Sequence, residues 1–174
     1  MTLRRFFLAC LGAVALVSCA PGATSAESTA MNPESASNVE IRLARGACFG
    51  FCPVYTVTIT GAGEIRYDGR NFVNVVGQRT ATIPAADVAR LVARFDEVGF
   101  HNLQDAYRAN VSDLPSYSVT LVRDGHTKTV VDYGGVDAGM PRAIRDLEAE
   151  IDRVAGTAQW ILRDGQPVRD RPQP

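Results

Sequence analysis

Apolar and polar residues alternate in short segments between residues 39 and 133, a pattern typical of β-strands with one buried face. Gly61-Ala62-Gly63, Asp68-Gly69 and Asp124-Gly125 mark the points where the chain is expected to reverse. The pattern predicts an antiparallel meander, followed later in the chain by a hairpin. The expected strands are 39–43, 54–60, 64–67, 72–76, 79–83, 117–121 and 127–133.

Two further segments have the period of an amphipathic helix. The first starts at Pro84, places one apolar face on every third or fourth residue and closes at Gly99. The second starts near Pro141 and ends by Gly156. The stretch 100–115 reads as irregular. We therefore predict an α+β fold with a mainly antiparallel sheet, meander plus hairpin, and two helices packed on one face.

The first eighteen residues have the composition of an export signal. Arg4 and Arg5 precede an apolar run that ends at Val17, which is too short to span a bilayer. The segment Leu16-Val17-Ser18-Cys19 resembles the bacterial lipobox, and the resemblance implies that cleavage leaves a diacylglycerol-modified Cys19 as the new N-terminus. An ordinary signal cleavage near Ala26, which would discard Cys19, is the alternative.

Composition divides the remainder into three parts. Residues 20–38 are small and polar, so residues 19–38 are expected to form a lipidated cysteine and a flexible tether. Residues 39–161 carry the periodic segments and are expected to form one domain. Residues 162–174 alternate charged, Gly and Pro residues, and we expect a disordered tail.

Charge argues against a nucleic-acid partner. Removal of residues 1–18 takes two arginines away and leaves 16 basic against 19 acidic residues, a net charge of −3. No basic patch of the kind that neutralises phosphates is evident. The expected contacts are instead the membrane, through the lipid on Cys19, and a protein of the cell envelope.

The segment from Arg45 to Tyr55 is the most distinctive part of the domain. It reads Cys48-Phe-Gly50-Phe-Cys52-Pro-Val-Tyr55 and is followed by the Gly-x-Gly turn and by Tyr-x-Gly at 67–69. This arrangement resembles a bacterial family of exported proteins, a domain of unknown function with the hallmark Cys-x-Gly-x-Cys-Pro-x-Tyr. The resemblance implies an exported, often lipid-anchored module without an assigned activity.

Cys48 and Cys52 admit two interpretations. Two thiols in an oxidising compartment usually pair, and a loop of about five residues closed by a disulfide would constrain the unfolded chain by roughly 2 kcal/mol. The same spacing resembles the copper loop of Sco-type delivery proteins, which hold copper with two thiolates and a distal histidine. In this chain His101 or His126 would supply that further ligand. The strand-like sequence after Cys52 argues against that second interpretation, because the Sco-type loop leads into a helix.

Phe49 and Phe51 flank Gly50 within this short loop. If exposed beside Arg45, they would form a recognition patch; burial of one or both rings against the sheet is the alternative. Carboxylates of Asp105, Asp113, Asp132 and Asp137 could meet at one end of the sheet, but nothing in the sequence brings them together. We expect no catalytic triad, no metal site and no cofactor.

These observations predict a lipid-anchored envelope protein with a non-catalytic binding or structural module. Ala20 stands where an inner-membrane retention signal would have Asp, so we expect an outer-membrane lipoprotein with a periplasmic domain. The alternative is a periplasmic thiol-redox or copper(I)-handling protein that uses Cys48 and Cys52.

Overall fold

Period-two strands pair into one large sheet, as the sequence pattern predicts. The computed structural model describes residues 38–170. The signal peptide, Cys19, tether residues 20–37 and residues 171–174 lie outside the described residues. Within the described part, no helix has the length and apolar character needed to cross a bilayer.

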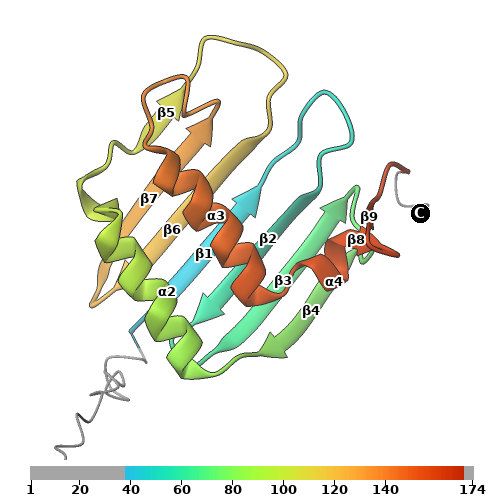
Figure 1. The fold of residues 1–174 in the computed structure, drawn as a ribbon. Coiled ribbons are helices and arrows are strands. Elements are labelled where there is room, and N and C mark those ends of the chain that lie inside the picture. The colour runs from blue at the N-terminus through green and yellow to red at the C-terminus, as the bar shows by residue number, and fades with distance from the viewer. Residues whose placement is uncertain (1–37, 171–174) are drawn as a thin grey trace, which may run out of the picture.

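The large sheet has the strand order β4-β3-β2-β1-β6-β7-β5 (Figure 1). All neighbours pair antiparallel except β5 and β7, which are parallel. The order leaves β4 and β5 as the two edges, so the sheet is open. Its strands are β1 (Glu40–Arg45), β2 (Val54–Thr60), β3 (Glu64–Asn71), β4 (Gly77–Thr82), β5 (Ala106–Arg108), β6 (Ser116–Arg123) and β7 (His126–Tyr133).

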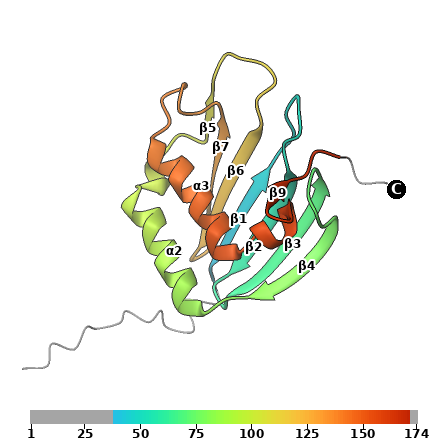
Figure 2. The ribbon, with the colours of Figure 1, turned by 45° about the vertical axis from the view of Figure 1, so that its right-hand side comes forward.

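Helices cover one face of this sheet (Figure 2). Two longer helices carry most of the cover, α2 (Ala85–Glu97) and α3 (Arg142–Ala155), and α3 ends at Gly156 in the left-handed conformation. The α+β prediction with two helices on one face is therefore confirmed. The shorter elements are η1 (Phe100–Asn102), α4 (Ala158–Ile161) and a two-stranded sheet of β8 (Leu162–Arg163) and β9 (Gln166–Pro167).

The core lies between the sheet and the helices. Alternate residues of the central strands, such as Leu43, Val57 and Val119, are buried. The helices meet them with their apolar faces, which include Phe95 of α2 and Leu147 of α3. Burial of this apolar surface, at about 25 cal/mol per Å², is the main contribution that holds the helices on the sheet. The opposite face of the sheet is rich in Thr, Ser and Arg.

The segment 68–76 differs from its prediction. Asp68 and Gly69 do not turn the chain but continue β3, and residues 72–76 form a bend instead of a strand. A Cβ at Gly69 would collide with the Tyr67 hydroxyl and the Val75 carbonyl, so this glycine permits close packing within a strand. Phe72 has a φ of 54°, a left-handed conformation that breaks the alternation.

Two other segments also depart from expectation. The irregular stretch 100–115 contains η1 and β5, whose three residues are too short to give a periodic signal. Residues 162–170, expected to belong to a disordered tail, contain β8 and β9, and Val168 is buried. The turn Asp164-Gly165, with both residues at positive φ, closes this hairpin.

Candidate functional site

Three loops meet at one end of the sheet. Residues 46–53 join β1 to β2, residues 72–76 join β3 to β4, and residues 109–115 join β5 to β6 (Figure 1). The described chain enters β1 at the opposite end, where Glu40 pairs with Thr60 and Val122. The loop end of the domain therefore lies opposite the end at which the described chain begins.

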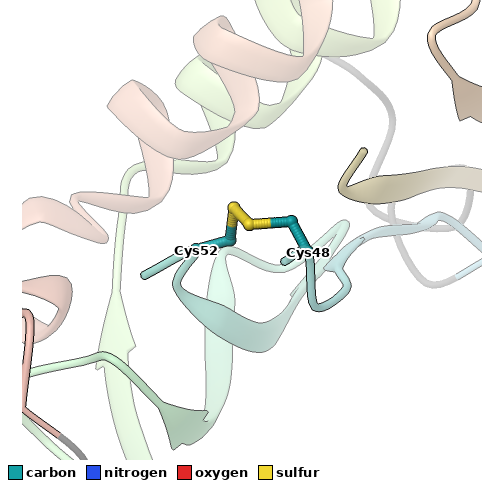
Figure 3. Close-up of a disulfide and its surroundings, with 2 residues drawn as sticks. All are labelled: Cys48 and Cys52. Atoms are coloured by element: carbon teal, nitrogen blue, oxygen red, sulfur yellow. A yellow bond between two sulfur atoms is a disulfide. The ribbon is translucent and has the colours of Figure 1, made fainter. Parts of the chain in front are cut away.

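A disulfide closes the first of these loops (Figure 3). Cys48 and Cys52 are bonded, with their Cα atoms 5.8 Å apart, which confirms the predicted pairing. The Phe49 N–H donates a hydrogen bond to the Asp113 carbonyl over 3.3 Å, so the loop is also fixed to residues 109–115. Its backbone is held at two independent points.

The three loops carry a set of exposed apolar side chains that we call the apolar cap: Phe49, Phe51, Val76 and Val111. Their exposed fractions are 89%, 55%, 47% and 53%, and in the described part of the chain they are the exposed large apolar residues. Phe51 packs edge-on against Phe72, with ring centroids 5.5 Å apart. Exposed apolar residues gathered at one end of a domain mark an interaction surface.

Beneath the loops, α3 presents charged residues to the sheet. The Arg45 guanidinium and the Asp152 carboxylate form an ion pair at 2.6 Å. The hydroxyls of Tyr55 and Thr157 donate to Asp152 Oδ1 over 2.6 and 2.8 Å. Burial opposes the charge on Arg45, but the charge and hydrogen bond of Asp152, together with the neighbouring Tyr55 and Glu148, outweigh it and hold the pKa of Arg45 above its ordinary value. Burial, and then the charge of Asp152, raises the pKa of Tyr55.

A second group lies next to the first. Asp132 of β7 is 1% exposed, accepts a hydrogen bond from the Gly135 N–H over 2.6 Å, and pairs with Arg145 Nε at 2.6 Å. Glu148 is 2% exposed, and among the described residues nothing donates a hydrogen bond to its Oε1. Burial, and then the charge of Asp132, raises the pKa of Glu148 to about 8. Glu148 therefore carries a proton at neutral pH.

Tyr117 links the two groups. The Arg45 and Arg145 guanidinium carbons lie 4.4 and 5.1 Å from the centroid of its ring, on the geometry of cation–π contacts. We call Arg45, Asp132, Arg145, Glu148 and Asp152 the charged layer. With Glu148 protonated, two arginines balance two aspartates. The carboxyls of Asp132 and Glu148 are closed to solvent, so the layer is suited to holding α3 on the sheet and not to receiving a substrate.

The structure separates the three residues predicted as a recognition patch. Phe49 and Phe51 are exposed on the loop, whereas the Arg45 side chain, 15% exposed, points into the charged layer. The charged layer itself was missed by sequence reasoning. Its signal was present, because Arg145, Glu148 and Asp152 fall on the same helical face as Ile144 and Ile151.

The other chemical candidates are dispersed. His126 begins β7 at the end of the sheet opposite the disulfide, and His101 Nε2 lies 3.5 Å from Arg123, which ends β6 at that same end. The eight residues of β6 span roughly 25 Å between the two ends, so neither imidazole reaches the sulfur atoms. Residues 38–170 contain no group of three or more His, Cys, Asp and Glu side chains placed to hold a metal ion.

The fold and the site together define an α+β domain with a half-covered antiparallel sheet and a disulfide-closed loop at one end. The chain belongs to the DUF6438 family, a domain of unknown function, whose model matches residues 39–155. This confirms the resemblance at the level of an unassigned domain; bacterial origin and export stay predictions. No curated protein matches the chain. The match ends with α3 at Ala155, so Trp160, whose ring lies 4.9 Å from that of Tyr67 between centroids, lies beyond it.

Proposed function

We propose that this chain is a lipid-anchored cell-envelope protein whose folded domain is a non-catalytic binding module that acts through the apolar cap. The observation that carries the binding role is the gathering of Phe49, Phe51, Val76 and Val111 on three loops at one end of the sheet. An apolar side chain such as Phe49 has a higher free energy in water than in an apolar contact, so a partner that covers it is favoured.

The arrangement of charge supports a role without catalysis. Perturbed carboxyls often mark active sites, but a catalytic group must touch its substrate. Asp132 of β7 and Glu148 of α3 are buried between the helix and the sheet, where Arg145 balances the charge of Asp132 and Glu148 keeps its proton. The charged layer supports the loops above it.

The anchor is supported by the sequence. The lipobox-like segment places Cys19 about twenty residues before the first strand, a spacing that leaves a tether between lipid and domain. Ala20 at the position where an inner-membrane retention signal would have Asp supports an outer-membrane location. A protein of the envelope is the expected partner class beside the membrane itself.

Fatty-acid labelling in a bacterial host tests the anchor. An alkyne fatty acid is fed to cells that produce the full chain, and incorporation is compared with that of Cys19→Ala and Cys10→Ala. Cys10 is the matched control, because it belongs to the segment removed on cleavage. We expect label in the parent and in Cys10→Ala and none in Cys19→Ala. An unlabelled parent would overturn the anchor, and recovery in the inner-membrane fraction would overturn the outer-membrane assignment.

A further inference from the structure

The apolar cap is a protrusion held in shape before any partner arrives. The Cys48–Cys52 bond, the Phe49 N–H hydrogen bond to Asp113 and the edge contact of Phe51 with Phe72 restrict the loop at three places. A surface that is already ordered loses little conformational entropy on binding. Two residues beside it, Phe72 and Asp113, have φ values of 54° and 68°, and such strain gathers where loops have a function.

We propose that the apolar cap inserts into the headgroup–acyl boundary of a lipid bilayer and gives the domain a second membrane contact. This inference rests on the proposed function, because the lipid on Cys19 would keep the domain close to a bilayer. Shallow insertion of a few aromatic and aliphatic side chains binds a bilayer only weakly. It becomes effective when a second membrane contact, here the lipid anchor, holds the domain at the surface.

The size of the cap favours a bilayer over a protein partner. At about 200 Å² for a whole phenylalanine, the exposed parts of Phe49 and Phe51 offer roughly 300 Å². Val76 and Val111, each about half exposed, add roughly half as much again, so the cap offers about 450 Å² in all. A stable protein complex buries about 800 Å² on each partner, and so does a dimer formed by a second copy of this chain. A bilayer requires neither that area nor a complementary shape.

Charge around the cap is nearly balanced. Arg70, Arg108 and Asp113 are all exposed at the loop end of the sheet. Arg70 also pairs with Asp68 at 3.1 Å. Insertion is therefore driven by apolar burial, and it should depend little on anionic lipid.

The length of chain before the domain permits this contact although the cap lies at the far end of the sheet. Twenty residues from Cys19 to residue 38 reach at most about 70 Å when extended. The longest strands, with eight residues, span roughly 25 Å. The cap can reach the bilayer that holds the lipid on Cys19.

The test uses the full chain recovered from the cell envelope and placed in vesicles of phosphatidylethanolamine and phosphatidylglycerol. Phe49→Trp puts a fluorophore on the cap, and Thr82→Trp puts one on an exposed position of edge strand β4 at the opposite end of the sheet as a matched control. Trp160 is buried and supplies the background in the parent. Lipids brominated in their acyl chains quench only an indole that enters the bilayer.

We expect the Trp of Phe49→Trp to shift to the blue and to be quenched at least two-fold, with no change for Thr82→Trp. Phe51→Asp in the Phe49→Trp background should remove most of the quenching, and phosphatidylcholine in place of phosphatidylglycerol should not. A blue shift without quenching would mean that protein, including a second copy of the chain, covers the cap, and it would overturn the proposal.

Failure of the two proposals can be told apart. If the chain stays on the vesicles through an alkaline wash while position 49 is not quenched, the anchor stands and the inserted cap is wrong. If the wash removes the chain, the anchor is wrong, and quenching measured before the wash still decides the cap.

Discussion

Glu148 should make the stability of this domain fall as the pH rises. The residue is 2% exposed, and the two arginines of the charged layer are already balanced by Asp132 and Asp152. The folded state holds a proton on Glu148 up to a pH of about 8, whereas the unfolded chain releases it near 4.5. Between these values unfolding releases a proton, so the free energy of unfolding decreases with pH by up to about 1.4 kcal/mol per pH unit.

Below pH 4.5 Glu148 is protonated in both states and contributes no pH dependence. Above a pH of about 8 it is ionised in both states, and the free energy of unfolding has fallen by the full amount. The difference between the two pKa values sets an upper limit of about 5 kcal/mol, and water entry around an ionised Glu148 lowers it to roughly 2–4 kcal/mol. Glu148→Gln keeps the shape and cannot ionise. We expect this variant to match the parent within about 1 kcal/mol at pH 5 and to exceed it by roughly 2–4 kcal/mol at pH 9.

The assay is urea unfolding at pH 5, 7 and 9, followed by circular dichroism. Glu150→Gln is the control, because Glu150 lies on the same helix but pairs with surface arginines and should change stability by less than about 1 kcal/mol at every pH. Unfolding free energies of the parent and Glu148→Gln that stay parallel from pH 5 to 9 would refute the reasoning.

Three further variants test other parts of the account by the same unfolding assay. Asp152→Ala leaves Arg45 without its partner and should lower the free energy of unfolding by about 3–5 kcal/mol. The double change Arg45→Met, Asp152→Leu should recover most of this loss. A loss below about 1 kcal/mol for Asp152→Ala would show that the ion pair does not stabilise the domain. Joint replacement of Cys48 and Cys52 by Ser should cost about 2 kcal/mol, and no change would mean that the loop is held without its disulfide. Gly63→Ala should cost at least about 2 kcal/mol more than Gly77→Ala, because both positions have positive φ but only at Gly63 would a Cβ collide with the Ile83 carbonyl; equal costs would contradict this contact.

Local sequence patterns predicted the elements that depend on local periodicity. Alternation located β2 to the residue, and proline and glycine bracketed α3 from Pro141 to Gly156. The prediction failed where a contact with a residue far along the chain determines the local conformation. Residues 72–76 alternate like a strand but bend, because the Val75 N–H donates to the Trp160 carbonyl, far along the chain. Gly69 lies within a strand and not in a turn, because the Tyr67 hydroxyl occupies the space that a Cβ at position 69 would fill.

The site was predicted in part for the same reason. The disulfide follows from two cysteines in one short loop, whereas the sequence left open whether Phe49 and Phe51 are exposed or buried, and the structure shows both exposed. The charged layer joins residues about a hundred positions apart, such as Arg45 and Asp152, and a single sequence does not show such pairing. Arg45 was therefore grouped with the loop beside it instead of with α3.

The central claim is that the chain is exported, lipidated on Cys19 and closed by a structural disulfide. One measurement tests it most directly: the number of free thiols in the protein trapped from living cells by acid quenching and alkylation, read by intact mass. The account predicts none, because Cys10 leaves with the signal peptide, the lipid occupies Cys19, and Cys48 is bonded to Cys52. Two free thiols at Cys48 and Cys52, or an alkylated Cys19, would contradict it.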